Sequence, residues 1–292
     1  MSSTESFDPR FAALETWDTD TLARALLDTQ HDAATAARTA APALARAIDA
    51  CAARLTRGGR LIWLGAGTSG RLATLDAAEL TPTFDWPAAR AVPLMAGGPG
   101  ALLHAVEGAE DDGPAAIAAV TAIHLGAQDV VIGVAASGRT PFTLAGVRHA
   151  RALGALTLAV VNAADTPLTQ VAEIALVADT GAEIIAGSTR MKAGTAQKIL
   201  LNCLSTGVMV RLGFVHHGRM VEMRPTNAKL HARALAMVID LTGTGSEAAA
   251  AALALGGTIK LAVVMLTLDL GVEEARARLQ RADGILARAL AP

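Results

Sequence analysis

The chain has 292 residues, with 25 Lys and Arg residues against 27 Asp and Glu residues. This length suffices for one large α/β domain or a domain with an appendage, and the balanced charge gives no basic field for nucleic acid or an anionic membrane. Hydrophobic residues make up 52% of the chain and aromatic residues only 3%, so the core must consist mainly of Ala, Leu and Val.

Targeting signals and cysteine usage indicate the compartment. The amino terminus has neither the basic nor the apolar region of a signal peptide, and Lys260 and Asp269 interrupt the most apolar late stretch, which argues against a membrane span. Cys51 and Cys203 lie far apart without metal-type spacing, so we expect neither a disulfide nor a metal site. The pattern predicts a soluble protein of the cytoplasm.

Short apolar runs alternate with helical patterns from residue 61 onward. Before this alternation begins, residues 18–57 are rich in Ala, with Leu and Ile at helical spacing, and predict two helices. Leu61–Leu64 predicts a buried strand, followed by a helix from about Gly70 that Pro82 should stop. Ala91–Met95 predicts a second strand, which its proline places at a sheet edge.

The middle of the chain continues this alternation, and the end is helical. We expect three further strands, at 129–134, 155–161 and 174–177, and helices at 100–111, 114–124, 141–152 and 165–171. Ser188 or Thr189 can cap a long helix that runs to about Leu212. The tail from about Asn227 is helical, with breaks at 243–246 and 256–257.

Strands that alternate with helices imply right-handed crossovers and a parallel sheet with helices on both faces. We expect five strands in the order 2-1-3-4-5. The domain organisation that follows is an N-terminal helical segment at 1–57, an α/β domain at 58–220 and a C-terminal helical region at 221–292.

Three loops combine small residues, hydroxyls and a cation: Gly65–Arg71, Ala135–Thr140 and Gly187–Thr195. Backbone N–H groups, hydroxyl donors and one fixed positive charge are what a phosphate monoester needs. In a sheet of this order the loops after strands one and three flank the crevice in which ligands bind. The loops therefore indicate a protein that handles a small phosphorylated molecule.

Other interpretations of these loops exist. Gly65, Gly67 and Gly70 also satisfy the dinucleotide fingerprint, but this requires an acid at the end of the second strand, where Met95–Gly98 has none. The glycines could serve only a tight strand–helix turn, and Ser137 could be a simple helix cap. We therefore expect no nicotinamide cofactor.

The three loops, with the segment Gly181–Lys198 (the signature segment), resemble the sugar isomerase (SIS) superfamily. Within it, the chain from about residue 14 onward closely resembles the N-acetylmuramic acid 6-phosphate etherase family. The glucokinase regulatory protein family shares the signature segment but binds without catalysis. The resemblance implies a SIS-type fold and a cytoplasmic, homodimeric lyase of cell-wall recycling that binds an amino-sugar phosphate and needs no metal or cofactor.

The same resemblance assigns the catalytic pair. Elimination of an ether β to an aldehyde needs a base for the C2 proton and an acid for the departing oxygen, roles that two carboxyl groups with separated pKa values can fill. The resemblance implies Glu79 as the acid and Glu110 as the base, whereas the sequence alone allows the reverse. The family's Ser-Glu-Cys-Pro-Pro-Thr reads Ala-Glu-Leu-Thr-Pro-Thr here at Ala78–Thr83, which puts the surroundings of Glu79 in doubt.

Without the resemblance these carboxylates have plainer explanations. Glu79 would be a solvated helix end, and Glu107, Glu110 and two aspartates would form an exposed acidic helix end. Three histidines (His104, His124 and His231) are interpreted as structural or solvated, and His216-His217 lacks a metal-ligand partner in the sequence.

Residues of all three loops are the candidates for substrate and phosphate binding. Arg190 and Lys192 could neutralise phosphate or a lactate carboxylate, or be surface charges of a first helical turn. The candidate binding residues are Gly67, Thr68, Ser69, Ser137, Gly138, Arg139, Thr140, Ser188 and Lys192.

Three functions compete. The first is a lyase that removes D-lactate from N-acetylmuramic acid 6-phosphate. The second is a sugar-phosphate-sensing regulator, which should carry extra domains. The third is an aldose–ketose isomerase, which would abstract the same C2 proton. No helix-turn-helix with a basic recognition helix is evident, which disfavours a transcription factor.

Overall fold

The computed structural model describes residues 3–225 and 227–291 of the chain. It has two compact units, each described by itself: the first unit is Met1–Ala78 with Ala88–Thr206, and the second is Glu79–Pro87 with Gly207–Pro292. The segment boundaries expected at residues 57 and 220 stay predictions.

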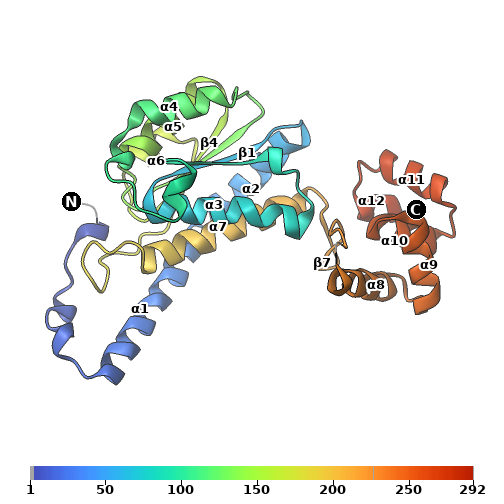
Figure 1. The fold of residues 1–292 in the computed structure, drawn as a ribbon, viewed down its shortest axis with the longest axis horizontal. Helices are drawn as coiled ribbons and strands as arrows, with labels where there is room; N and C mark the ends of the chain where they lie inside the picture. Colours follow the sequence, from blue (N-terminus) through green and yellow to red (C-terminus); the bar gives the residue numbers. More distant parts are fainter. Residues whose placement is uncertain (1–2, 226, 292) are drawn as a thin grey trace. The chain divides into compact units, whose positions relative to one another are not determined.

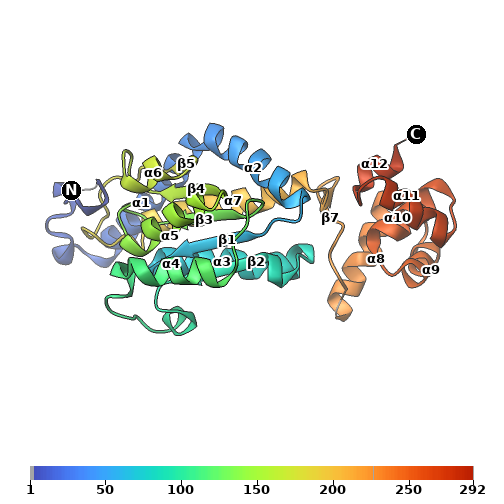
Figure 2. The same cartoon turned by 90° about the horizontal axis from the view of Figure 1, so that it is seen from above.

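A five-stranded parallel sheet forms the centre of the first unit. Its order is β2-β1-β3-β4-β5, as expected, and the strands follow one another in this order in Figure 2. β2 lies at an edge, where the missing N–H of Pro93 costs no ladder hydrogen bond. The strands are β1 (Leu61–Gly65), β2 (Ala91–Met95), β3 (Val130–Val134), β4 (Leu156–Val161) and β5 (Ile174–Val177).

Helices cover both faces of this sheet, which confirms the expected fold class. α4, α5 and α6 lie on one face, and α2, α3 and α7 lie on the other (Figure 1). The helices are α1 (Thr19–Thr39), α2 (Ala41–Thr56), α3 (Gly67–Phe84), α4 (Gly113–Ala122), α5 (Pro141–Ala152), α6 (Pro167–Val171) and α7 (Lys192–Arg211). α3 and α7 begin in the first unit and end in the second.

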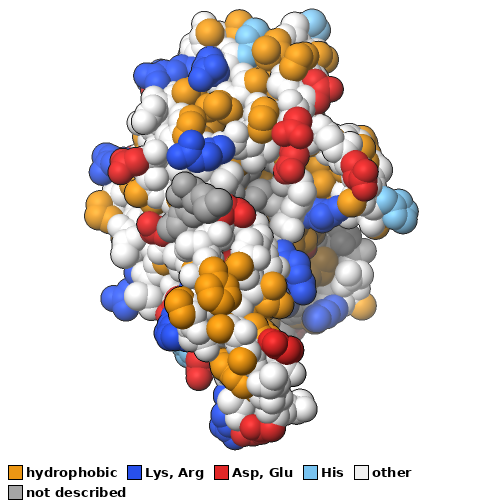
Figure 3. All heavy atoms as spheres, turned by 90° about the vertical axis from the view of Figure 1, so that its left-hand side faces the viewer, with side chains coloured by type: hydrophobic (Ala, Val, Ile, Leu, Met, Phe, Trp, Pro, Cys, Tyr) orange, Lys and Arg blue, Asp and Glu red, His pale blue; other side chains and the backbone are white. Residues whose placement is uncertain are grey.

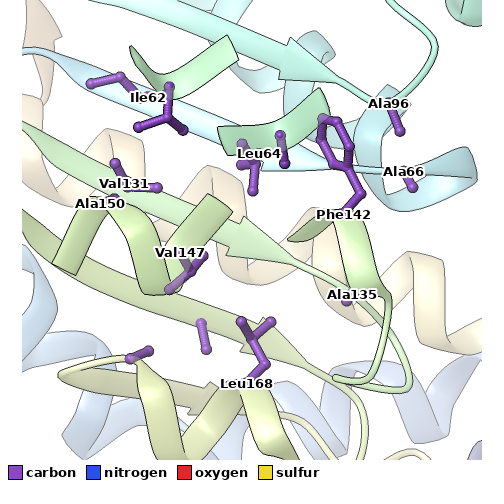
Figure 4. Packing of buried hydrophobic residues seen from close by; sticks show 14 of the residues in the cluster. Ile62, Leu64, Ala66, Ala96, Val131, Ala135, Phe142, Val147, Ala150 and Leu168 are labelled. Carbon is purple, nitrogen blue, oxygen red and sulfur yellow. The ribbon is translucent and has the colours of Figure 1, made fainter. Parts of the chain in front are cut away.

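The core between the sheet and α4–α6 consists of aliphatic side chains and one phenylalanine. Figure 4 shows the ring of Phe142 beside Leu64, with Val147 and Leu168 reaching toward the neighbouring strands. α5 packs very closely here, since a Cβ on Gly146 would lie 2.6 Å from Leu64 Cδ2. A larger residue at position 146 would therefore displace the buried side chain of Leu64.

On the opposite face a buried carboxylate joins three elements. Asp76 of α3 accepts hydrogen bonds from Trp63 Nε1 of β1 (3.2 Å) and, on α7, from Asn202 Nδ2 (2.8 Å) and Ser205 Oγ (3.0 Å). A buried polar group is tolerated when its bonding capacity is filled in this way. Asp76 therefore holds the helix that begins at Gly67 in place against the sheet.

The buried carboxyls predict a distinctive pH dependence of stability. Burial raises the pKa of Asp76 above 3.8 and that of Glu183 above 4.5. A native carboxyl with a raised pKa keeps its proton where the unfolded chain has lost it, so its contribution to the free energy of unfolding is present below about pH 4 and is lost as the pH rises through the native pKa. Asp76→Asn should flatten this decline, measured by urea unfolding at a series of pH values.

The exposed Glu15→Gln variant is the matched control and should keep the wild-type decline. An Asp76→Asn curve parallel to the wild-type curve would contradict the assignment.

Asp129 contributes to stability over a different pH range. Burial raises its pKa, but the hydrogen bonds from Arg60 and the Gly126 N–H lower it below 3.8 overall. Its contribution is present above that value and is lost as the pH falls.

The second unit is mainly helical and has its own core. Residues of the helices surround the buried Val238, Val263 and Val264, and the aromatic rings of Phe84 and Trp86 pack against Phe214. Its helices are α8 (Ala228–Thr242), α9 (Ser246–Gly256), α10 (Ile259–Leu268), α11 (Val272–Arg281) and α12 (Leu286–Leu290), and a short hairpin pairs β6 (Val215–His216) with β7 (Arg219–Met220).

Two local predictions were wrong. Pro82 does not stop α3, which continues to Phe84 and closes with a hydrogen bond from Asp85 N to Thr81 O (2.9 Å). A proline near a helix end removes only the bond to the carbonyl four residues earlier, on the exposed Ala78. The helix expected at 100–111 is instead two 3-10 turns, η5 (Pro99–Leu102) and η6 (Ala109–Asp111). Residues 103–108 separate them, and Gly108, directly before η6, lies in the left-handed region at φ 71°.

Among the described residues, no helix is both long enough and apolar enough to span a membrane. Cys51 is buried, Cys203 is exposed, and both are free thiols.

Candidate active site

The loop after β1 brings the start of α3 to the carboxyl end of the sheet. Gly67 adopts φ 53°, and a Cβ on Gly70 would lie 2.7 Å from Gly65 O. The glycine spacing that resembles a dinucleotide fingerprint therefore serves a close strand–helix turn. Thr68 and Ser69 in the first turn are half-buried, and their backbone N–H groups lie at the positive end of the helix dipole.

The loop after β3 presents a second helix start. Ser137 is not a helix cap: its Oγ accepts a bond from Arg139 N (3.2 Å), and the cap position of α5 is Thr140, whose side chain makes no capping bond. Gly138 adopts φ 62° and packs against Thr166 of the next loop. The Thr140 hydroxyl is thus available to a ligand at the N-terminus of α5.

These two loops meet around one cavity of about 420 Å³. Its size lies within the usual range for small-molecule sites, and two helix N-termini and several hydroxyls suit an anion. The structure brings together six of the nine candidate binding residues here, together with Glu110. The lining residues are Glu5, Ala66, Gly67, Thr68, Ser69, Glu110, Asp111, Ala136, Ser137, Arg139, Thr140, Pro141 and Thr189.

The helix that begins within the signature segment is capped differently from the expectation, because a glutamate carboxylate already accepts hydrogen bonds from its first backbone N–H groups. α7 begins at Lys192, and the buried Glu183 accepts bonds from Lys192 N (3.1 Å) and Ala193 N (2.9 Å). The prediction that Ser188 or Thr189 caps this helix was therefore wrong; a side chain nine residues upstream folds back to do so. Thr189 contributes to the cavity instead.

Four predicted polar residues lie outside the cavity lining, and one of them, Arg190, is exposed. Lys192 is 4% exposed and pairs with Asp32 of α1 at 3.6 Å, and Ser188 is half-buried beside it in the loop. The Arg71 guanidinium donates to Ala101 O (2.9 Å) and Leu102 O (3.1 Å), so it supports the wall of the site.

The two candidate catalytic glutamates occupy different surroundings. Glu110, in the turn η6, lines the cavity together with Asp111. Glu79 is exposed on α3, ten residues after Ser69, which corresponds to about 15 Å along a helix axis. It is not among the residues that line this cavity.

Sequence reasoning missed two parts of this region. Glu5, near the amino terminus, lines the cavity. Residues of the stretch 97–109, which directly follows β2, line a mainly apolar cavity of about 940 Å³ and a smaller cavity of about 220 Å³. The smaller cavity shares Ala66, Gly67 and Glu110 with the first cavity. Glu5 could not be found from spacing, because it is distant in sequence from the strand ends that it approaches, and the stretch 97–109 was expected to be mostly helical.

The loop before α7 and the N-terminal segment lie at the same end of the first unit in Figure 1, and Figure 3 faces that end. Acidic and basic side chains are interspersed on that end of the molecule. Within the described part of the chain, no three His, Cys, Asp or Glu side chains form a group that could hold a metal ion.

We expect Ser137→Ala to weaken binding of a phosphorylated ligand. A hydrogen bond to a charged group contributes about 1.5–3 kcal/mol, which corresponds to roughly tenfold to 150-fold in affinity. Calorimetric titration with an amino-sugar phosphate measures this, with the exposed Ser246→Ala of α9 as control. Unchanged affinity, or equal affinity for the unphosphorylated sugar, would contradict a phosphate at Ser137.

Comparisons with known proteins agree with the fold. The model of the glucokinase regulatory protein N-terminal SIS domain matches residues 43–150, and the SIS domain model matches residues 113–206. The structure of a phosphoheptose isomerase from Francisella tularensis is similar with a TM-score of 0.51 and 20% identity, covering 66% of this chain and 98% of that chain. The fold and the domain matches together place this chain in the class of SIS-fold proteins.

Sequence relatives narrow the class. A Deinococcus radiodurans protein named N-acetylmuramic acid 6-phosphate etherase is 52% identical, covering 96% of this chain and 92% of the relative. A Cronobacter sakazakii protein of the same name is 49% identical, covering 86% of this chain and 85% of the relative. The chain belongs to the N-acetylmuramic acid 6-phosphate etherase family.

Proposed function

We propose that this protein removes D-lactate from the 3-ether of N-acetylmuramic acid 6-phosphate and gives N-acetylglucosamine 6-phosphate. The observation that carries the proposal is 52% identity, over 96% of the chain, to a protein named for this substrate. It is an enzyme that cleaves a carbon–oxygen ether bond, and we assign it to the lyases because the ether leaves by elimination before water adds.

The cavity supports a bound phosphate in this proposal. Ser69, Ser137 and Thr140 donate hydroxyl hydrogen bonds to the phosphate, and Thr68, Gly67 and the other loop residues bring backbone N–H groups of two helix starts close to it. Arg139 supplies the cation at the same cavity. In this arrangement Lys192 stabilises the signature segment through Asp32, and Ser188 shapes the loop that carries Thr189.

Glu110 and Glu79 carry the chemistry in our proposal. In the open-chain aldehyde, the Glu110 carboxylate takes the C2 proton, and the electron pair forms the C2–C3 double bond as the C3–O bond breaks. Glu79 protonates the departing lactyl oxygen. Water then adds at C3 and a proton returns to C2, which yields the amino-sugar phosphate. The position of Glu110 at the cavity supports its role; the role of Glu79 rests on family membership.

We also propose that the enzyme acts in the cytoplasm and as a homodimer. Two free cysteines agree with a reducing compartment. We infer the dimer from the family resemblance, and sedimentation of the purified protein, which measures its molecular mass in solution, tests it.

The deciding experiment incubates the purified protein with N-acetylmuramic acid 6-phosphate and measures D-lactate. The unphosphorylated sugar serves as the control substrate, and we expect release from the phosphorylated one only. Binding without lactate release would instead support a regulator, and an aldose–ketose conversion of the ligand would support an isomerase.

A further inference from the structure

The beginning of the described chain takes part in the wall of the candidate site. Ser3–Glu5 forms the turn η1, and Thr4 is completely buried, although it lies close to the start of the sequence. Glu5 lines the cavity together with Ser69, Ser137 and the other loop residues. The side chain of Thr4 would be exposed in a solvated tail, so this turn packs against the first unit, and the exposed Glu5 lies at the cavity.

The signature segment holds Glu5 close. Gly187 adopts φ 75°, and a Cβ added there would lie 3.3 Å from Glu5 Oε2, so the carboxylate lies against the backbone of this loop. Two residues further on, Thr189 lines the same cavity. Glu5 thus reaches the cavity from the side of the signature segment.

The residues that follow form a second local turn. Asp8 caps the turn η2 (Pro9–Phe11) and binds Arg10, with 3.0 Å from Arg10 Nε to Asp8 Oδ2. The pKa of Asp8 is lowered mainly by its side-chain bond to Arg10, and a smaller contribution comes from the charge of Lys192.

The chemistry of a carboxylate indicates what Glu5 would bind. An ionised glutamate only accepts hydrogen bonds, so it repels a phosphate but suits the hydroxyl groups of a sugar. The hydroxyls and helix starts of the first two loops provide for the phosphate, and Glu5 adds an acceptor on the signature-segment side. A sugar phosphate has both kinds of group, whereas inorganic phosphate has only one.

We propose that Glu5 is a substrate-binding residue that accepts hydrogen bonds from the sugar hydroxyls of the phosphorylated ligand, and that the N-terminal turn Ser3–Glu5 is a wall of this site. The proposal rests on the proposed function only in taking the ligand to be a sugar phosphate. Because such bonds form equally with bound substrate and transition state, their loss raises KM and leaves kcat nearly unchanged.

The test compares Glu5→Gln with Glu15→Gln, an identical change at an exposed residue of η3 (Leu14–Thr16) that does not line the cavity. Each variant is titrated with N-acetylglucosamine 6-phosphate and with inorganic phosphate in a calorimeter. Glu5→Gln should bind the sugar phosphate about tenfold to a hundredfold more weakly, the range expected for a bond to a charged group, and inorganic phosphate as well as or better than wild type. Glu15→Gln should match wild type within about twofold for both ligands.

Four results would overturn the proposal. The first is that the affinity of Glu5→Gln for the sugar phosphate stays within twofold of the wild-type affinity. The second is an equal loss of affinity for both ligands, which would show a purely structural role. The third is tighter binding of both ligands, as expected if Glu5 obstructs the site. Wild type that binds no sugar phosphate would overturn it as well. Wild type that binds the sugar phosphate but releases no lactate would refute the proposed function and leave the binding test of Glu5 valid.

Discussion

Replacing Glu110 by Gln is expected to lower D-lactate release by about 10²–10⁴-fold, because loss of a general base typically costs that much in rate. The change keeps the size of the side chain and its place at the cavity but removes its ability to take a proton. If Glu110 is the base, exchange of the C2 proton with solvent deuterium should stop together with lactate release. Proton NMR in deuterium oxide and a lactate assay measure the two steps separately.

Glu79→Gln should separate these two steps. Proton exchange at C2 needs the base but not the acid for the leaving group, so this variant should keep measurable C2 exchange while lactate release falls by a similar factor. Both side chains are exposed in the structure, so neither change should affect folding strongly. Circular dichroism melting curves check that assumption.

Glu247→Gln is the matched control, since Glu247 is an exposed carboxylate of α9 that lines none of the three cavities described above. It should retain wild-type rates. A Glu110 or Glu79 variant within a factor of two of wild type would remove that residue from the mechanism. Exchange that persists in Glu110→Gln and is lost in Glu79→Gln would show that the pair is correct and the roles are reversed.

Gly138→Ala is expected to damage both stability and ligand binding. At φ 62° an L residue costs about 1–2 kcal/mol. In addition, the new Cβ would lie 2.2 Å from Thr166 Oγ1, the buried hydroxyl that caps α6. Displacing that cap costs roughly 1 kcal/mol more, so the free energy of unfolding should fall by about 2–3 kcal/mol in urea denaturation.

The affected loop carries Ser137 and Thr140, so affinity for a sugar phosphate should fall with stability. Gly181→Ala is the matched control: its φ is 63°, but nothing lies within 4 Å of an added Cβ. This control should lose only the conformational part, about 1–2 kcal/mol, and should bind ligand normally. Equal losses in the two variants would show that the contact with Thr166 does not restrict the loop.

The alternation of short apolar strands with helices was sufficient to predict the first unit. Strand β5 and helix α5 have the predicted bounds, because a parallel sheet buried on both faces leaves continuous apolar runs that differ clearly from amphipathic helices. The proline in β2 marked an edge strand, since only an edge tolerates a residue without N–H there. The loops after β1 and β3 could likewise be predicted to meet, because strand order alone brings their ends together.

Only the tertiary structure decided which polar groups are available to a ligand. Glu183 folds back onto the start of α7, and Asp32 pairs with Lys192, so the signature segment contributes Thr189 to the cavity rather than a free helix start. Nothing in the spacing of Glu5 marks it as a wall of the site, because its place depends on how residues far apart in sequence pack. Periodicity and turn chemistry are local and can be predicted from sequence, whereas the partners of a buried charge depend on the folded arrangement of the whole unit.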